Sequence, residues 1–223
     1  MSARFARLIA IDAETVTLDT ASLAMSSALQ PDLDEMDALV ALDVFAGDCP
    51  TPTPDGVARY LFDTLGFNGN RTAYYDWRNS CLDRVIATRV GIPISLSILM
   101  IEVARRVGVP LVGVGMPAHF LVRAADDENT FYDPFHGPDR LDRAGARRLF
   151  EQVTNGQSPW RDSYLAPTPN RDIVIRMLNN LKGSFARQSD AVRFAIVMQL
   201  RGVVPELADT ELAELTAATA IFN

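Results

Sequence analysis

One apolar segment limits the possible folds of this chain more than any other part of the sequence: the run from Ile92 to Ala104. It contains Ser95, Ser97 and Glu102, and it is too short and too polar to cross a bilayer. Pro93 suits the first turn of a helix, where its missing N–H leaves no hydrogen bond unmade. The apolar residues that follow at helical spacing are Leu96, Leu99, Met100, Val103 and Val107. The run therefore predicts a helix of a soluble protein.

The predicted secondary structure changes from helix to strand after this segment. Arg105 and Arg106 favour a helix C-terminus, Gly108 suits the position just past it, and Pro110 prevents continuation. Three short strands are then predicted, with a turn over Asp126–Asn129 between the second and the third; they cover residues 111–115, 118–123 and 130–133. This region predicts a small antiparallel sheet.

The segments before the long apolar run are expected to be helical. A helix capped by Thr20 or Ser22 should end before Pro31. A second helix, opened by Asp32 or Asp34, should end near residue 47, and its apolar positions are Met36, Leu39, Val40 and Val44. The proline-rich residues 49–54 predict a stiff linker, after which further helices are expected over 54–65 and around 82–86.

Helices are also predicted after the strands, over 142–153, from Asn170 onward, and as a pair between residues 190 and 222. The order of helices, a small antiparallel sheet and more helices predicts the α+β class. We find no internal repeat and no low-complexity segment in the sequence.

Charge and composition argue against several classes of protein. The chain has 21 Lys and Arg against 28 Asp and Glu, a net charge of −7, so we expect neither a nucleic-acid partner nor an anionic membrane surface. Two cysteines, Cys49 and Cys81, are too few for a disulfide framework or a cysteine-rich zinc site. The start, Met1–Arg7, lacks the apolar segment of a secretion signal. We therefore expect a cytoplasmic protein.

The sequence contains two histidines, and one of them lies in a predicted strand. If the strands around His119 and Asp133 pair as a hairpin, the carboxylate lies beside the imidazole. It would then orient the ring and stabilise its protonated form, which is the support that a general base needs. The alternative is structural: His119 is a half-buried strand residue, and Asp133 caps the turn that contains Pro134.

Other chemistry finds less support in the sequence. A metal site made of His119, His136 and an acidic residue is conceivable, but no spacing matches a zinc signature, so no metal and no cofactor are predicted. The Gly113–Gly115 segment lacks the third glycine of a dinucleotide site. Cys81, in a predicted helix, is expected to be a buried structural thiol, and Cys49 is assigned no role.

A series of short motifs runs through the chain in order. They are Leu61-Phe62, Gly66–Asn70, Tyr74-Tyr75-Asp76, Asn79-Ser80, Arg89–Ser97, Val103–Pro110, Pro117–Arg123, Asp133–Gly137 and Arg176–Lys182. Together they resemble the transglutaminase-like core family of SirB-type bacterial proteins over roughly residues 20 to 185. The resemblance implies a papain/transglutaminase-like fold with a helical N-terminal part, a core helix, and a sheet that carries a histidine and an aspartate.

The same resemblance suggests three parts of the chain. We expect an N-terminal helical subdomain over 1–53, a transglutaminase-like core over 54–165, and C-terminal helices over 166–223. Many SirB-type proteins continue into tetratricopeptide repeats. Here the residues after Lys182 leave room for one helix pair, which we expect to pack on the core because repeats need several neighbours.

The resemblance also implies the residues of a site. Catalytic transglutaminases begin the core helix with a cysteine, but Pro93 occupies that position here. Ser95 is the nearby candidate nucleophile, and its alternative role is a bond to local backbone. The other implied residues are His119 as base, Asp133 as its orienting partner, and Asn79, Arg89, Pro93 and Ile94 as binding residues.

Two classes of function remain open on this basis. In the first, the protein is an acyl-transfer or amide-bond enzyme that acts on a small molecule or a peptide. In the second, it is a non-catalytic module whose cleft binds a peptide or a protein partner. The absent cysteine favours the second class, and the His119–Asp133 pair favours the first.

Overall fold

The computed structural model describes residue 5 and residues 17–208, so the last of the predicted helices, apart from its start, lies outside the described residues. The first helices are α2 (Leu18–Leu29), α3 (Glu35–Gly47), α4 (Pro54–Arg59) with the π-helical turn η1 (Tyr60–Thr64), the 3-10 turn η2 (Trp77–Ser80) and α5 (Leu82–Thr88). The strands β1 (Asn68–Gly69) and β2 (Val90–Gly91) form a short parallel pair, and α6 (Pro93–Arg106) follows.

The second half begins with a four-stranded sheet. Its strands are β3 (Leu111–Val114), β4 (Leu121–Ala124), β5 (Phe131–Tyr132) and β6 (Arg140–Leu141), antiparallel and in chain order. The helices α7 (Arg143–Val153), η3 (Asp162–Leu165), α8 (Asn170–Gln188) and α9 (Ala191–Arg201) follow, and the described part ends in helical residues 205–208. The predicted α+β class is confirmed.

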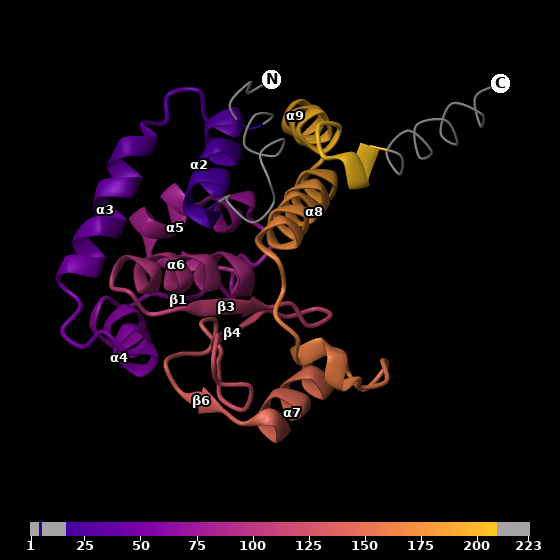
Figure 1. Cartoon of the computed structure of the whole chain (residues 1–223). Coiled ribbons are helices and arrows are strands. Elements are labelled where there is room, and N and C mark those ends of the chain that lie inside the picture. The colour runs from indigo at the N-terminus through magenta and orange to yellow at the C-terminus, as the bar shows by residue number, and fades with distance from the viewer. Residues whose placement is uncertain (1–4, 6–16, 209–223) are drawn as a thin grey trace.

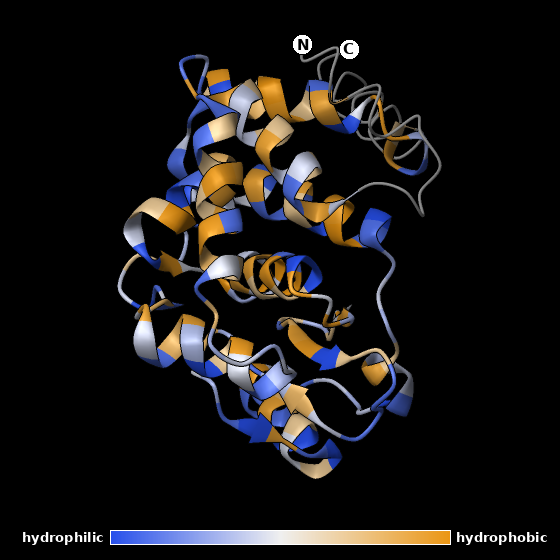
Figure 2. Cartoon of the chain, turned by 60° about the vertical axis from the view of Figure 1, so that its left-hand side comes forward, coloured by the Kyte–Doolittle hydropathy of each residue, from blue (hydrophilic) through white to orange (hydrophobic). Residues whose placement is uncertain are grey.

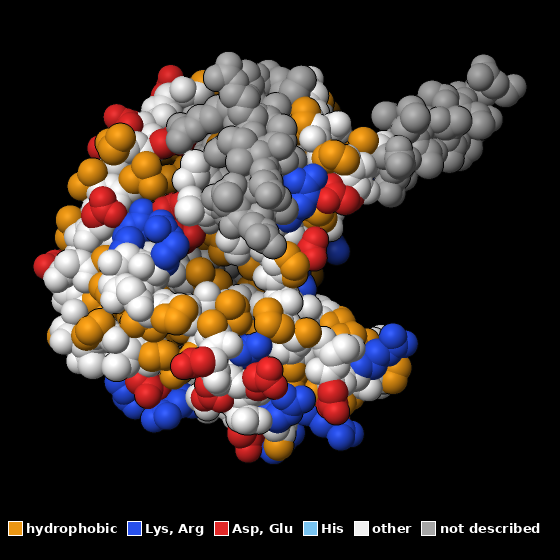
Figure 3. Space-filling view, in the orientation of Figure 1, with side chains coloured by type: hydrophobic (Ala, Val, Ile, Leu, Met, Phe, Trp, Pro, Cys, Tyr) orange, Lys and Arg blue, Asp and Glu red, His pale blue; other side chains and the backbone are white. Residues whose placement is uncertain are grey.

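Helix α6 lies in the middle of the molecule, with helices on one side and the sheet on the other (Figure 1). Every residue from Pro93 to Ala104 is buried, which is why its sequence is apolar all round rather than along one stripe. In Figure 2 the hydrophobic colour gathers on the helices of the interior. The space-filling view in Figure 3 shows the surface hollowed between the helical part above and the sheet-bearing part below.

Two predicted details of the N-terminal helices are wrong. Helix α2 begins at Leu18, earlier than expected, and the N–H of Leu18 donates to the Glu102 carboxylate at 2.9 Å. Helix α3 is capped by Asp34, one of the two predicted caps, but it buries Ala38, Leu42 and Ala46. The expected core positions Met36, Val40 and Val44 are 61%, 50% and 50% exposed. Small alanines allow α3 to lie close to its neighbours α5 and α6, so the bulkier face points outward.

The sheet differs from the sequence prediction at two places. Strand β4 begins at Leu121 because residues 117 and 118 form a turn, in which Ala118 has a φ of 62°. His119 therefore precedes the strand instead of lying within it. Strand β6 was not predicted, since two residues are too few to show alternation.

The C-terminal helices pack against the first part of the chain. Phe185 of α8 and Val197 of α9 belong to one buried cluster with Leu29 of α2 and Trp77 of η2. The division at residues 53 and 165 is not tested by these contacts and stays a prediction. Within residues 17–208, no helix has the length and apolar character needed to cross a membrane.

Candidate functional site

A turn and a strand end bring His119 and Asp133 together. His119 follows the turn at Ala118, and Asp133 follows β5, which pairs with β4 through Val122 and Tyr132. The Nε2 atom of His119 lies 3.0 Å from each carboxylate oxygen of Asp133. Both residues are only 4% exposed. The hydrogen-bonded contact expected from the hairpin is present, while the role of the pair in catalysis is a separate question.

Asp133 also receives hydrogen bonds from two other groups. Nδ1 of His136 lies 2.7 Å from Oδ2, and the N–H of Phe135 donates to Oδ1 at 3.1 Å. Burial acts to raise the pKa of Asp133, but the hydrogen bonds and charges of His119 and His136 outweigh it and hold this pKa at about 2. The carboxylate is therefore ionised at neutral pH.

The same three side chains are the candidate metal ligands of the described residues. One ligand atom each from His119, Asp133 and His136 lies within 4.8 Å of the other two. These atoms already form the hydrogen bonds described above, which satisfy the carboxylate without a cation. The geometry does not test the expected absence of a metal, which stays a prediction.

A cavity of about 160 Å³ lies beside His119. Because Asp133 occupies Nε2, the other ring nitrogen, Nδ1, is the one that has no hydrogen-bond partner among the described residues. Pro93 and Ile94 at the start of α6 line the same cavity, so two predicted binding residues lie next to the predicted base. The remaining lining residues are Tyr74, Ile92, Ala118, Phe120, Arg176 and Asn180.

The start of α6 offers hydrogen-bond donors near this cavity. Pro93 has no N–H, and within the described residues the N–H groups of Ile94 and Ser95 have no protein acceptor, as is usual in the first turn of a helix. The helix dipole adds partial positive charge at this end. A developing negative charge on a bound group would be stabilised here.

Ser95 is not brought to His119. Its side chain is 1% exposed and does not line the cavity. The hydroxyl donates to the carbonyl of Asn79 at 2.6 Å and accepts from the N–H of Ile92 at 3.1 Å. These bonds join the start of α6 to η2, which matches the alternative role of a serine that bonds to backbone.

Asn79 and Arg89 also lie outside the cavity lining. Nδ2 of Asn79 donates to the carbonyls of Ala73 and Tyr74 at 2.7 and 3.1 Å, so it holds the loop that carries Tyr74 into the lining. Arg89 ends α5 with a φ of 59°, and its Nη1 donates to the carbonyl of Leu65. The structure gives both residues contacts with the backbone.

The sequence analysis missed Arg176 and Asn180 as site residues. They lie one turn apart on α8 and both line the cavity beside His119. Nη2 of Arg176 donates to the carbonyls of Met116 and His119 at 2.5 and 2.7 Å. The only signal in the sequence was that both belong to one motif, and a helical stripe alone does not say which residues meet a distant turn.

Cys81 is the structural thiol that was expected. It is 1% exposed, and burial, together with the charge of Asp83, raises its pKa to about 12. It lines none of the cavities described here.

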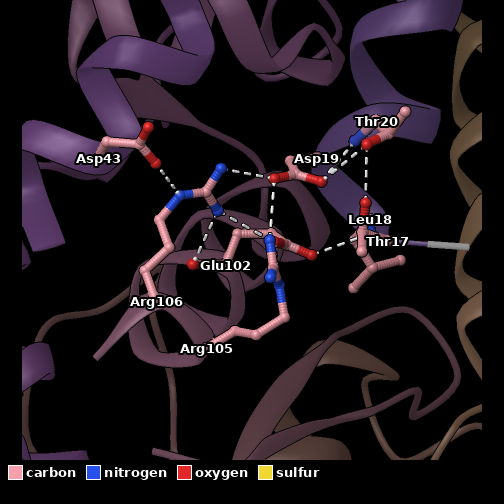
Figure 4. A network of polar contacts seen from close by, with 8 residues as sticks. All are labelled: Thr17, Leu18, Asp19, Thr20, Asp43, Glu102, Arg105 and Arg106. Atoms are coloured by element: carbon pink, nitrogen blue, oxygen red, sulfur yellow. Dashed lines mark hydrogen bonds and ion pairs between the residues drawn. The ribbon is translucent and has the colours of Figure 1, made fainter. Parts of the chain in front are cut away.

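A second polar cluster, partly buried, lies at the opposite end of α6 (Figure 4). Arg106 contacts Asp19 of α2 and Asp43 of α3 at 2.7 Å each and Glu102 at 3.2 Å. Arg105 contacts the same Glu102 at 2.8 Å. Burial acts to raise the pKa of Asp19, but hydrogen bonds from Thr17 and Arg106 hold it at about 2. We call these five charged residues the ionic cluster.

Comparison with known proteins gives three kinds of result. The model of the transglutaminase-like superfamily matches residues 24–179. The UPF0162 protein of Xylella fastidiosa (strain Temecula1) is 47% identical over 135 residues, which are 58% of this chain and 48% of that protein; its counterpart in Vibrio cholerae is 36% identical over the same shares. Human F-box only protein 21 is 46% identical over 69 residues, 31% of this chain and 11% of that protein.

The chain thus spans about half the length of the bacterial relatives that it matches. No solved structure matches it.

Proposed function

The chain belongs to the transglutaminase-like superfamily, and we propose that it catalyses acyl transfer to, or hydrolysis of, an amide or ester bond, with His119 as general base. The observation that supports this most is the contact of His119 Nε2 with both oxygens of Asp133 at 3.0 Å, beside a cavity that His119 also lines. This contact orients the ring and leaves Nδ1 for a substrate. The expected substrate is a small molecule or a peptide of the cytoplasm.

The proposed reaction needs no covalent intermediate on the protein. Because Pro93 occupies the position of the usual thiol, the nucleophile is water or an amine or hydroxyl of a second substrate. Its oxygen or nitrogen attacks the acyl carbon while Nδ1 of His119 takes its proton. The N–H groups of Ile94 and Ser95 then stabilise the oxyanion. When the bond to the leaving group breaks, the same proton moves from Nδ1 to that group, and His119 returns to its first state.

Asp133 supports both proton transfers in this scheme. Its pKa of about 2 keeps it negatively charged at neutral pH, so it stabilises the imidazolium that forms when Nδ1 is protonated. It stays ionised throughout, and its bond with His119 Nε2 fixes which nitrogen of the ring faces the substrate.

A second candidate function is that of a non-catalytic binding module. It is favoured by the lining of the cavity, since no serine, threonine or cysteine of the described residues belongs to it. In this case the His119–Asp133 pair would hold the turn at Ala118 and would take no part in chemistry.

Restoring the thiol separates the two functions. We would introduce Pro93→Cys in a Cys49→Ser background, with the buried Cys81 left in place. If the pair is aimed at the helix start, the new thiol should have a lowered pKa and should react with iodoacetamide at pH 7 at least about tenfold faster than in the variant that also carries His119→Ala. Equal labelling rates in the two folded variants would favour the binding module.

Hydrolysis of 4-nitrophenyl acetate gives a direct measure of the proposed chemistry. The unmodified chain should accelerate it, and His119→Ala should lower the protein-dependent rate by about 10²-fold, the smaller end of what a general base contributes. Arg59→Met, on an exposed pair far from the cavity lining, is the matched control and should leave the rate unchanged. A rate equal in His119→Ala and the unmodified chain would contradict the proposal.

A further inference from the structure

We infer that Arg176 and Asn180 form the carboxylate-binding side of the cavity beside His119, so that the ligand of this site carries a free carboxylate group. The inference rests on the proposed function only where it calls this ligand a substrate. The binding itself follows from the charge, the donors and the size of the cavity.

Arg176 is the positively charged side chain in the lining of this cavity. Among the described residues no Asp or Glu lies within ion-pair distance of it, although both N–H groups of Nη2 are used by the carbonyls of Met116 and His119. Its guanidinium lies 5.4 Å from the centre of the Phe120 ring, and burial lowers its pKa. Nε and Nη1 make no hydrogen bond to a described residue. A guanidinium held in this way has unused donors and favours an anion.

The residues that line the neighbouring cavity also favour an anion over a cation. A second cavity of about 190 Å³ shares Tyr74, Ile92 and Asn180 with the first and continues along α8 to Arg187. Among the described residues no Asp or Glu lines either cavity, although the chain as a whole has a net charge of −7. By contrast, Asp133 and Asp139 line the cavity of about 430 Å³ beside His136. Among the cavities described here, these two along α8 are therefore the ones whose linings favour an anion.

The size and the donors of the cavity indicate which anion fits. A volume of about 160 Å³ admits a small terminal group, and it is too small for a folded partner surface. The guanidinium of Arg176 presents donors in a plane, which matches the two oxygens of a carboxylate, and Asn180 offers an amide N–H₂ one turn further along α8. Pro93 and Ile94 at the start of α6 line the same cavity.

The test compares ligands that differ in one charge. The full chain is titrated with N-acetyl-alanyl-alanine, with its C-terminal amide and with inorganic phosphate, and binding is followed by NMR. The free acid should bind at least tenfold more tightly than the amide. N-acetyl-glutamic acid α-amide, whose carboxylate is in the side chain, shows whether the site takes a chain terminus or a side chain. Phosphate binding more tightly than every carboxylate would overturn the assignment.

Two variants test the residues. Asn180→Asp adds a negative charge to the cavity and leaves the bonds of Arg176 to Met116 and His119 in place, so it should weaken binding of the free acid at least tenfold. Gln157→Glu, at an exposed position after α7, adds the same charge elsewhere and should leave binding unchanged. Arg176→Lys keeps the charge but loses the planar pair of donors, and should also weaken binding.

The outcomes separate this inference from the proposed function. Equal binding of acid and amide, or binding that Asn180→Asp does not change, would overturn the inference even if His119-dependent hydrolysis is found. Tight binding of the acid together with an unreactive Pro93→Cys thiol would uphold the carboxylate site and contradict the proposed chemistry.

Discussion

The two ends of helix α6 each carry a partly buried group of charged and polar side chains, and the two groups are built differently. At the C-terminal end, the ionic cluster joins α2 and α3 to α6 (Figure 4), and its members line none of the cavities described here. At the N-terminal end, Asp133 is fully hydrogen-bonded, but Nδ1 of His119 and three N–H groups of Arg176, on Nε and Nη1, have no hydrogen-bond partner among the described residues.

The difference teaches how to separate structural from functional buried charge in this fold. In the ionic cluster each acid contacts an arginine, so the charges satisfy one another and leave nothing for a ligand. Near His119 the polar groups are bound on one side only, and their free donors or acceptors point to chemistry or binding. The comparison predicts that substitutions in the ionic cluster mainly lower stability, whereas substitutions near the cavity mainly change catalysis or binding.

The largest effect on stability is expected at the ionic cluster. Arg106→Met removes the side chain that contacts Asp19, Asp43 and Glu102, and it leaves the buried carboxylates of Asp19 and Glu102 to share the half-exposed Arg105. We expect the free energy of unfolding to fall by about 3–5 kcal/mol, measured by urea denaturation at pH 7. The control Arg59→Met breaks an exposed pair with Asp63 and should cost less than about 1 kcal/mol.

If Arg106→Met lowers the free energy of unfolding as little as the control does, the ionic cluster is not structural and the contrast between the two ends of α6 is wrong. Binding of N-acetyl-alanyl-alanine by folded Arg106→Met should match that of the unmodified chain.

An intermediate effect, with a defined dependence on pH, is expected at Asp133. Its pKa is lowered from 3.8 to about 2, so the folded state binds fewer protons in this range than the unfolded state. The stability that it contributes, about 2 kcal/mol, is present above pH 4 and is lost as the pH falls through 2. The unfolding free energies of Asp133→Asn and the unmodified chain should differ by this amount at pH 6 and by roughly half of it at pH 3.

A difference between the two proteins that stays constant from pH 6 to pH 3 would show that Asp133 is not held in its charged form. Asp19 has the same lowered pKa at the other end of α6, so both proteins should still lose stability in acid.

The smallest effect is expected at Ser95. It follows the cavity-lining residues Pro93 and Ile94 in the chain, but its hydroxyl is already hydrogen-bonded to backbone groups. Ser95→Ala removes the bonds to Asn79 and Ile92 and should lower the free energy of unfolding by about 1–2 kcal/mol. The rate of 4-nitrophenyl acetate hydrolysis should not change. If Ser95→Ala keeps nearly full stability but loses as much rate as His119→Ala, Ser95 takes part in the reaction and this prediction is wrong.

Sequence reasoning succeeded where local pattern decides the structure. The start of α6 at Pro93, the cap at Asp34 and the meeting of His119 with Asp133 all depend on residues close in the chain. Hydrophobic period and capping chemistry are sufficient for the first two, whereas the spacing of His119 and Asp133 left a structural alternative open and the family resemblance favoured their pairing.

Sequence reasoning failed where residues far apart decide the structure. The first turn of α2 is held by a hydrogen bond to Glu102, 84 residues away. The carbonyl of His119 accepts a hydrogen bond from Arg176, 57 residues away. No periodicity in either segment contains this information. The outward-facing Met36 of α3 shows the same limit, because an apolar stripe does not say which of two possible faces the neighbouring helices cover.

The site is divided between a hairpin and a distant helix, and this has a consequence for the order of folding. The contact of His119 with Asp133 closes a loop of 14 residues, whereas that of Arg176 with His119 closes one of 57, which costs more chain entropy. We expect the histidine–aspartate contact to form first and the docking of α8 to come later in refolding. A nascent chain that ends before residue 170 could thus already hold the base in place, but the cavity for its ligand would be complete only when α8 has left the ribosome.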